Sequence, residues 1–496
     1  MVKQAQGDPH DMGGVYSMAS GISVPSANAF QRAGERGPVL LQDAHLIELL
    51  SHFNRERIPE RVVHAKGSGA HGTFTCTDDI SDLCMTDLFS KKGNSCPLTI
   101  RFSTVGGEAG STDAARDSRG FSIKLKTQEG NMDWVFLNSP VFFIRDPTKF
   151  VFINHVAKRD PRSHLGLADD STMFWDFFGT NPEAAHQFTY IFGSRGIPKS
   201  WRHLNGYSCH TYKMYNKKGE WVFVQVHFKS AQGVEGLTEE EAAKVSPDHA
   251  QRDLFENIEK GNFPKWKIGV QTMTEEQAEK SGINVLDMTK TWPYDKYPIR
   301  WFGEMELNEN PCNYFAEVEQ SAFSPANMVP GFASSADPVL QARLFAYADA
   351  ARYRVGANWQ QLPVNKAMVQ YPYMNFARDG AHAVDNQGAR PNYPSSLYPL
   401  DYKPDPVPYT KLYSKHESEA VMSLSEISDA DFAGPKTLYT KVFSDEERQR
   451  FVKDVSNSMN KVRPDCKKHV FTRALAVWKR VDETLAQQIS QKLVLN

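Results

Sequence analysis

The feature that most limits how this chain can fold is a succession of short strand-like runs between about residues 60 and 310. Residues 98–102, 120–125 and 221–228 contain β-branched and aromatic residues, and Gly and Asn turns separate runs of this kind. Short strands joined by tight turns are typical of an antiparallel barrel. Helical stretches interrupt the pattern at residues 238–244 and 252–260. The sequence therefore predicts a large antiparallel β-barrel with helical insertions.

Segments of different character flank this region. Residues 1 to about 50 mix Gly, Ser, Asp and Pro with little periodicity, which indicates an extended arm. Residues 310–425 are dense in Pro, Asn and Tyr around one helix, and so long a connection is expected to wrap over another surface. From Ser444 onward a serine cap, acidic residues and 3–4 spacing of apolar residues predict helices. We expect an α+β fold with an N-terminal arm (1–55), a β-barrel domain (56–309), a wrapping segment (310–425) and a C-terminal helical domain (426–496).

Composition and charge exclude several classes of protein. The formal net charge is −2 and no basic block is long enough to follow a phosphate backbone, so a nucleic-acid partner is not expected. No apolar run approaches the ~18 residues of a membrane span. The first ten residues lack the apolar core of a signal peptide, and the 6 cysteines form no CxxC pair, which favours free thiols in a reducing compartment. A terminal peroxisomal Ser-Lys-Leu signal is absent, so cytoplasm is the expected compartment and the peroxisome the alternative.

The first stretch that could carry chemistry is the helix beginning at Asp337-Pro338. A capping carboxylate followed by Pro at the first helical position is a strong helix start. Arg343 and Tyr347 stand four residues apart on that helix and share a face. A guanidinium beside a phenol favours the phenolate, which is an anionic ligand suited to ferric haem. The alternative, a packed surface pair, is the usual meaning of an Arg and a Tyr at this spacing.

The second stretch is residues 53–67, which contain His64. An imidazole can take a proton from one oxygen of a peroxide and deliver it to the other, which assists cleavage of the O–O bond. Taken alone, a histidine such as His64 is more often a satisfied core histidine. The following residues 67–72 are glycine-rich, but their spacing does not match a nucleotide loop and no β-α unit follows, so we reject that interpretation.

Several motifs in one order resemble the monofunctional haem catalase family. Residues 55–72 resemble its active-site signature and residues 343–347 its haem-ligand signature. Residues 101–105, 116–120, 140–146, 205–207 and 313–320 also follow the family's order. The resemblance runs from about residue 37 to the helical tail. It implies an eight-stranded antiparallel barrel, iron protoporphyrin as the cofactor, hydrogen peroxide as the substrate and assembly as a homotetramer.

Carried over by position, the resemblance implies roles for residues around the haem. Tyr347 is implied as the axial ligand of the iron, and Arg343 keeps it anionic, with His210 and Asp337 as a relay behind Arg343. His64 is implied as the distal acid–base, with Ser103 hydrogen-bonded to it. The further implied contacts are Val63 over the haem, Phe142 and Phe150 in the distal cavity, and Arg61, Arg101 and Arg354 at the propionates, where guanidinium groups bind carboxylates bidentately.

The chain departs from the family at the distal side. Leu137 stands where the family has its second distal polar residue, an Asn. Asn138 is adjacent but is expected to point the other way, because neighbouring strand residues face opposite sides. Ile153 replaces a usual cavity phenylalanine, and residues 348–353 also differ from the usual run. We interpret these differences as a remodelled haem pocket, less polar near the oxidant.

A nucleotide site is partly kept in the resemblance. His186, Arg195, Lys229 and Trp292 match positions associated with NADPH, whereas Tyr294 replaces a histidine. The resemblance therefore allows NADPH as a second cofactor without requiring it.

Three functions stay open at this point. The first is a catalase, which converts two peroxides to water and dioxygen through a ferryl haem, with activity attenuated by Leu137. The second is a catalase-like enzyme in which peroxide-charged haem oxidises or rearranges a small organic substrate. The third is a haem-binding scaffold without activity, which the charged residues around Tyr347 argue against. An apolar distal wall favours the second over the first only in part.

Overall fold

The structure is a computed structural model that describes residues 13–370, 375–385, 387–402 and 421–495. Part of the predicted wrapping segment and the first residues of the predicted arm lie outside the described residues. The chain divides into two compact units, Met1–Glu60 and Arg61–Asn496, and each is described by itself. The four predicted domain boundaries stay predictions.

The first unit contains a single helix within its described residues, α1 (Ala44–Phe53). Asp43 caps it by accepting a hydrogen bond from the Leu46 backbone, and its other oxygen accepts one from the Gln31 backbone at 2.6 Å. The Tyr16 hydroxyl lies 2.8 Å from Nε2 of His45. Most of the remaining side chains of this unit are exposed.

The second unit is built around a closed antiparallel barrel of eight strands. In order around the ring these are β1 (Gly67–Cys76), β2 (Ser95–Ser103), β3 (Gly120–Thr127), β4 (Gly130–Leu137), β5 (Gly206–Tyr207), β7 (Trp221–Ser230), β8 (Lys265–Met273) and β9 (Arg300–Glu309). Pairing of β9 with β1 and of β7 with β8 closes the ring, and β6 (Tyr212–Tyr215) and β10 (Phe332–Ser334) extend it beside β7. The predicted barrel and its three quoted strands are confirmed.

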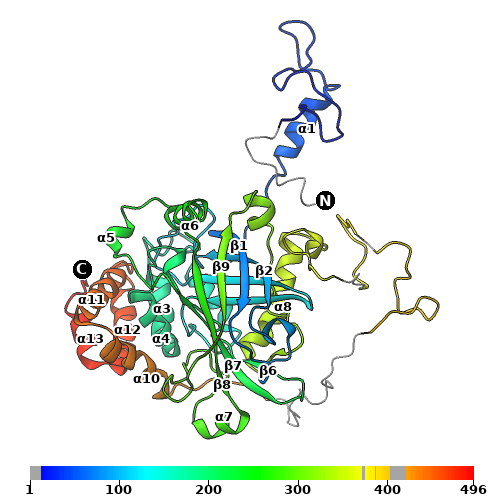
Figure 1. Cartoon of the computed structure of the whole chain (residues 1–496). Helices are drawn as coiled ribbons and strands as arrows, with labels where there is room; N and C mark the ends of the chain where they lie inside the picture. The colour runs from blue at the N-terminus through cyan, green and yellow to red at the C-terminus, as the bar shows by residue number, and fades with distance from the viewer. Residues whose placement is uncertain (1–12, 371–374, 386, 403–420, 496) are drawn as a thin grey trace. The chain divides into compact units, whose positions relative to one another are not determined.

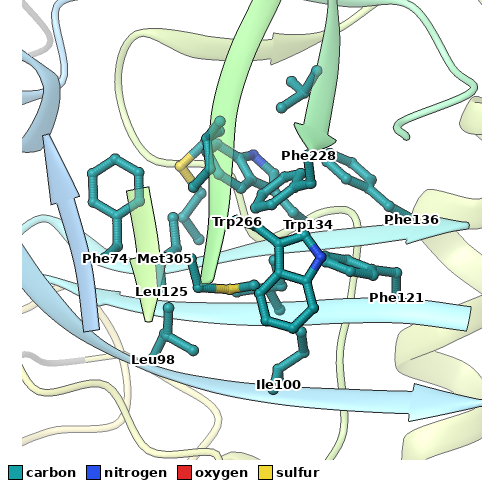
Figure 2. Packing of buried hydrophobic residues seen from close by; sticks show 14 of the residues in the cluster. Phe74, Leu98, Ile100, Phe121, Leu125, Trp134, Phe136, Phe228, Trp266 and Met305 are labelled. Atoms are coloured by element: carbon teal, nitrogen blue, oxygen red, sulfur yellow. The ribbon is translucent and has the colours of Figure 1, made fainter. Parts of the chain in front are cut away.

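Aromatic side chains fill the inside of the barrel. Figure 2 shows Trp134 and Trp266 in the middle of this core, with rings from several strands around them. The ring centroids of Trp134 and Phe228 lie 5.7 Å apart, edge to face, and those of Phe121 and Trp266 lie 5.9 Å apart. Burying one such side chain stabilises a fold by roughly 2–3 kcal/mol. The barrel is therefore a packed core, and any site must lie outside it.

One row of side chains on the outer face of the barrel positions the site. Cross-strand partners lie side by side on the same face. Reading across β2, β3, β4, β5 and β7, the paired residues are Ser103, Gly120, Leu137, Tyr207 and His227. Their chain neighbours Phe102, Phe121, Phe136 and Phe228 belong to the inner core, so the row itself faces outward.

Helices form a second core outside the barrel. Near the C-terminus lie α10 (Ala430–Thr437), η7 (Leu438–Val442), α11 (Asp445–Asn460), α12 (Lys467–Val481) and α13 (Glu483–Ser490). They pack with α3 (Thr172–Thr180) and α4 (Ala185–Phe192) around Phe188, Phe451 and Trp478. Figure 1 shows these helices gathered at one side of the barrel. Ser444 and Glu447 form a capping box at the start of α11, which confirms the predicted helix start.

The other elements are short or lie between strands. The helices among them are α2 (Lys149–Val156), α5 (Glu239–Ala242), α6 (His249–Glu259), α7 (Glu275–Ser281) and α8 (Pro338–Arg354), and the single turns are η2 (Asp87–Phe89), η3 (Pro182–Ala184), η4 (Trp201–His203), η5 (Phe315–Glu319) and η6 (Trp359–Gln361). The two predicted helical insertions correspond to α5 and α6, and the predicted capped helix to α8.

A buried charge cluster connects the first of the C-terminal helices, α10, to loops of the barrel region. Arg145 and Lys290 each donate to the Asp431 carboxylate at 2.5 Å, and the Ser428 backbone donates to its other oxygen at 2.9 Å. These three donors outweigh the opposing effect of burial and lower the Asp431 pKa to about 2. Asp431 is only 2% exposed, so its carboxylate depends on these partners.

We predict that Asp431→Asn lowers the thermal unfolding midpoint at pH 7 by several degrees. Removing one partner of a buried ion pair costs about 3–5 kcal/mol, because the other charges stay buried. The folded-state pKa lies below the ordinary value of 3.8, so the carboxylate's contribution is full above about pH 4 and is lost as pH falls toward 2. Calorimetry should therefore show a smaller difference in unfolding midpoint between the parent and the variant at pH 3 than at pH 7.

The matched control is Asp429→Asn. Asp429 stands at the start of the same helix, α10, and pairs with Arg480. The side chain of Asp429 is fully exposed. Exposed pairs contribute little, so this variant should unfold like the parent. Equal losses in both variants would contradict the role given to the buried cluster.

Candidate active site

The distal candidate His64 precedes β1 in the chain. Its imidazole lies beside the end of β2 and is held there through Nδ1. This nitrogen lies 2.9 Å from the Ser103 hydroxyl and 3.1 Å from the Thr104 carbonyl oxygen. A carbonyl only accepts, so Nδ1 carries the hydrogen and Nε2 keeps its lone pair. Burial, reinforced by the guanidinium groups of Arg101 and Arg343, lowers the His64 pKa to about 3. The imidazole is therefore neutral at physiological pH, with Nε2 available as a base.

The backbone of His64 adopts a left-handed conformation, with φ of 68°. This conformation costs a non-glycine residue about 1–3 kcal/mol, so surrounding contacts must hold it. Arg101 donates to the carbonyl oxygens of His64 at 2.7 Å and Ala65 at 3.0 Å, and the His64 amide donates to Val105 at 3.1 Å. Arg101 thus fixes the backbone that aims the imidazole.

Gly120 gives the imidazole its space. A Cβ on Gly120 would lie 2.3 Å from the Ser103 hydroxyl oxygen and 2.8 Å from Nδ1 of His64. Real Cβ atoms do not approach other atoms so closely. The absence of a side chain at this position is therefore a requirement of the His64–Ser103 pair.

The proximal candidates lie on α8. Asp337 caps this helix by accepting from the Val339 and Leu340 amides. One turn further, Arg343 donates through one nitrogen to the Tyr347 hydroxyl at 2.8 Å and to the Val135 carbonyl at 2.9 Å. Burial alone would lower the Arg343 pKa, but the Tyr347 phenol outweighs it and raises the pKa above its ordinary value. The structure therefore holds a permanent cation against the oxygen of Tyr347.

The predicted relay behind Arg343 is present in part. Nδ1 of His210 lies 2.6 Å from the Asp337 carboxylate, and both side chains are buried. Burial lowers the His210 pKa, while Asp337 opposes that shift. The charge of Arg343 also lowers the His210 pKa, and the described contacts include no direct hydrogen bond between the two side chains.

The three arginines predicted to bind propionates come together. Arg61 donates to the carbonyls of Val318, Glu319 and Ser321, and Arg354 donates to those of Glu319 and Ser321. Glu319 is the acid of this cluster, 3.5 Å from Arg61 and 3.7 Å from Arg354. Burial lowers the Arg354 pKa to about 10, which Arg101 reinforces and Glu319 opposes. Three guanidinium groups and one carboxylate leave an excess of two positive charges.

These residues fit a haem. An excess charge of two is what two propionates neutralise, and Nε of Arg101 is a buried donor without a partner among the described residues. Tyr347 offers a phenol oxygen that can bind iron, and His64 offers a neutral base. Arg61, Arg101 and Arg354 are the residues that can hold the propionates, and Tyr347 with Arg343 can hold the iron. Val63 is half-buried directly before His64, as the position over a haem requires.

Leu137, one of the positions predicted to be remodelled, belongs to the row of outward-facing side chains next to His64. Leu137 pairs directly with Gly120, so its side chain shares the face on which His64 and Ser103 lie. The Asn138 amide is turned away, because its oxygen accepts from the Arg119 backbone at 2.8 Å and its nitrogen donates to the Arg195 carbonyl at 3.2 Å. Asn138 therefore does not offer its amide on the side where Leu137 lies.

An apolar wall continues from Leu137. Phe142 and Ile153 are buried in the second core, and Leu137 and Phe150 pack against that core. The rings of Phe142 and Phe150 are stacked, with centroids 6.4 Å apart. The four predicted wall residues thus belong to one cluster.

Two of the four NADPH candidates, His186 and Arg195, contact the ring of Tyr190. His186 stacks on Tyr190 at 5.3 Å, and Arg195 lies over the same ring and donates to the Tyr207 hydroxyl at 3.1 Å. His186 and Trp292 are almost fully buried, whereas Lys229 is exposed. A cavity of about 210 Å³, counted with its open solvent, lies beside Arg195 and Asn205.

Sequence reasoning missed three contributors to the site. These are Gly120, the Thr104 carbonyl that fixes the His64 tautomer, and Glu319, which balances the arginines. Gly120 and Glu319 fall inside motifs that carried the family resemblance, but neither spacing nor residue type indicates their contacts. Their roles depend on partners that are distant in sequence, such as the 258 positions between Arg61 and Glu319.

Comparison with known proteins places these features in a family. Residues 17–399 match the family model described as catalase, and residues 426–493 match the model described as catalase-related immune-responsive. The chain belongs to the catalase family. The predicted resemblance is therefore confirmed, and family membership makes the chain a haem oxidoreductase of the hydroperoxidase type.

Relatives of this catalase-family chain include fungal proteins. It is 53% identical over 396 residues to the peroxisomal catalase of Candida albicans, covering 79% of this chain and 81% of the relative. It is 46% identical over 488 residues to the catalase of Schizosaccharomyces pombe, covering 96% and 92%. The structure of catalase A from Saccharomyces cerevisiae superposes with a TM-score of 0.93 at 43% identity, covering 96% and 98%. The predicted fold class is confirmed.

A search of the described residues for membrane spans finds no helix that is both long enough and apolar enough to cross a bilayer.

Gly120→Ala should displace His64 and Ser103, because the added methyl group overlaps both. We expect dioxygen release from peroxide to fall about 10²-fold, the lower range of what a positioned acid–base contributes. The Soret band should persist, because Tyr347 and the arginines are unchanged. An oxygen electrode and an absorption spectrum measure both. Gly110→Ala is the control, since a Cβ there meets nothing within 4 Å, and equal rates in all three proteins would disprove the crowding argument.

Tyr347→Phe should abolish the anionic oxygen ligand and change the ferric absorption spectrum of protein loaded with haem. Tyr212→Phe is the matched control, because Tyr212 is a buried phenol in the field of the same Arg343 but is not bonded to it. We expect an altered spectrum and lower haem retention only for the Tyr347 variant. An unchanged iron spectrum in that variant would remove the axial-ligand assignment.

Proposed function

We propose that this chain is a catalase-type hydroperoxidase, which converts 2 H2O2 to 2 H2O and O2 with activity lowered by Leu137. The observation that carries the proposal is the pairing of a neutral imidazole, whose Nε2 is free, with a phenol oxygen held by a guanidinium. Both groups belong to the same compact unit. The combination supplies a base for peroxide and an anionic ligand for ferric iron.

The residues act in the following way. Bound haem supplies the two-electron redox chemistry that peroxide decomposition needs. Nε2 of His64 takes the proton from one peroxide oxygen and delivers it to the other, which turns the leaving hydroxide into water. Ser103 and Thr104 keep the proton of the resting imidazole on Nδ1. Arg343 donates a hydrogen bond to the Tyr347 oxygen, which would bind the iron.

Leu137 is the reason to expect lowered activity. It occupies the face of His64 without offering a hydrogen-bond donor to bound peroxide. Loss of one pre-organised donor costs about 3 kcal/mol, or roughly 10²-fold in rate. The loss falls to about 1 kcal/mol where the donor serves a neutral group, so His64 can sustain a reduced turnover.

The apolar residues at and around Leu137 support a second candidate function. Phe142 and Ile153 are buried in the second core, Leu137 and Phe150 pack against it, and Leu137 pairs with Gly120 next to His64. Apolar walls with few polar groups are typical of sites for organic ligands. In this alternative, hydrogen peroxide charges the haem and a small organic molecule is oxidised or rearranged. A scaffold without activity does not explain the buried pair His210–Asp337 behind Arg343.

The proposal also covers NADPH binding, assembly as a homotetramer and location in the cytoplasm. NADPH would bind around Arg195 and Lys229, with His186 and Trp292 as buried walls, and equilibrium dialysis tests this. A homotetramer agrees with the family, and sedimentation equilibrium tests it. Cytoplasm is the compartment we expect, although relatives from Candida albicans and Pichia angusta are named peroxisomal catalases. Fractionation of cells separates the two compartments.

Leu137→Asn should raise dioxygen release from hydrogen peroxide by about 10-fold or more, since it restores a donor worth up to ~3 kcal/mol. Leu137→Val is the control, because it alters shape without adding a donor. An oxygen electrode measures all three proteins at equal haem content. In the alternative function, peroxide-driven oxidation of an apolar probe such as styrene is greater for the parent than for the Asn variant. Equally fast dioxygen release by parent and both variants would contradict the remodelling.

A further inference from the structure

The side of the site that Leu137 occupies offers no free hydrogen-bonding side chain. Leu137 pairs directly with Gly120, which has no side chain and whose Cβ would lie 2.8 Å from Nδ1 of His64. Its neighbour along the chain, Asn138, has its amide oxygen and nitrogen bonded to backbone groups of other segments, at 2.8 and 3.2 Å. Neither neighbour therefore presents a side-chain donor or acceptor to a molecule that lies beside Leu137.

Leu137 itself presents apolar surface to the site. Its side chain is half-buried, and it packs against the core that contains Phe142 and Ile153. The imidazole of His64 occupies the room that Gly120 leaves, so the Leu137 side chain stands next to it on the same face of the sheet. An alkyl group at this place would meet carbon atoms and would be removed from water, which favours its binding.

Hydrogen peroxide and an alkyl hydroperoxide require different things from such a site. Hydrogen peroxide carries an O–H group on each oxygen, and each group needs an acceptor when it is buried. Nε2 of His64 supplies a lone pair for one of them. An O–H group that points toward Leu137 finds no acceptor there, which weakens binding about tenfold. An alkyl hydroperoxide has only one O–H group, and its alkyl group contacts Leu137 instead.

We propose that the peroxide cleaved at this site is an alkyl hydroperoxide with a small apolar alkyl group, and that Leu137 selects it over hydrogen peroxide. This inference rests on the proposed hydroperoxidase function, because His64 and the haem act on the O–O bond in both cases. It names the substrate class that suits the apolar distal side. Hydrogen peroxide remains the molecule that reduces the haem after the cleavage.

The atoms and electrons balance with hydrogen peroxide as the reductant. His64 takes the proton from the terminal oxygen of the alkyl hydroperoxide and delivers it to the oxygen that bears the alkyl group. The O–O bond breaks, an alcohol leaves, and the haem supplies two electrons and retains the terminal oxygen. One hydrogen peroxide then returns two electrons and two protons and leaves as dioxygen, while the retained oxygen leaves as water. In sum, ROOH and H2O2 give ROH, H2O and O2.

The first experiment gives the holoenzyme equal concentrations of tert-butyl hydroperoxide and hydrogen peroxide. Gas chromatography measures tert-butyl alcohol, and an oxygen electrode measures dioxygen. Each dioxygen reports one haem oxidised by either peroxide, and each alcohol reports one haem oxidised by the alkyl hydroperoxide. The ratio of alcohol to dioxygen is therefore the selectivity, whatever the haem content. A tenfold preference for the alkyl hydroperoxide makes this ratio about 0.9 in the parent.

Variants at position 137 test the role of the side chain. Leu137→Asn should lower the ratio to about 0.1, because its amide partners the second O–H group and is itself unsatisfied beside an alkyl group, two factors of about ten. Leu137→Val is the control, because it keeps the surface apolar and should keep the ratio of the parent. A parent ratio near zero, or equal ratios in the parent and the Asn variant, would overturn the proposal.

The second experiment measures binding without turnover. Cyanide binding to the ferric holoenzyme is followed by the shift of the Soret band, with and without tert-butyl alcohol. The alcohol should occupy the space beside Leu137 and raise the apparent dissociation constant for cyanide severalfold in the parent but not in Leu137→Asn. An identical constant with and without the alcohol in the parent would overturn the proposal. A parent without a Soret band, or without dioxygen release from hydrogen peroxide alone, would instead contradict the proposed function.

Discussion

The site depends on cross-strand pairing across the outer face of the barrel. Closure of the ring through β9–β1 and β7–β8 fixes the register of every strand. With that register, Ser103, Gly120 and Leu137 stand side by side, and each contributes something different to His64. Ser103 bonds the imidazole, Gly120 leaves it room, and Leu137 makes its surroundings apolar. A shift of one residue in any strand would turn these side chains into the barrel core.

Charge is the second organising element. Arg101 holds the strained backbone of His64 and also belongs to the cluster that suits two propionates. The same guanidinium therefore couples the position of the base to the seat of the cofactor. On the other side, Arg343 sets the charge of the Tyr347 oxygen, and the buried His210–Asp337 pair lies behind it. The Glu319 carboxylate offsets one of the three positive charges of Arg61, Arg101 and Arg354 before the cofactor binds.

Much of the fold was accessible to sequence reasoning, because local signals decide its elements. The Asp337-Pro338 start fixes where α8 begins, and the spacing of Arg343 and Tyr347 makes them neighbours whatever surrounds the helix. The capping box at Ser444 is equally local. The contacts of Gly120, Glu319 and Arg101 could not be found in this way, because their partners lie on other strands or on a π-helical turn.

The family resemblance named residues for the haem site, but it did not show how they interact. Sequence alone determined the strand and helix pattern and the neighbourhood of Arg343 and Tyr347, and the resemblance predicted that Leu137 replaces a polar residue. Only the tertiary structure decided that Leu137 faces His64, that Asn138 is turned away, and which nitrogen of His64 is the base. The reason is physical: periodicity along a chain fixes which side chains share a face, whereas strand register and packing fix what that face meets.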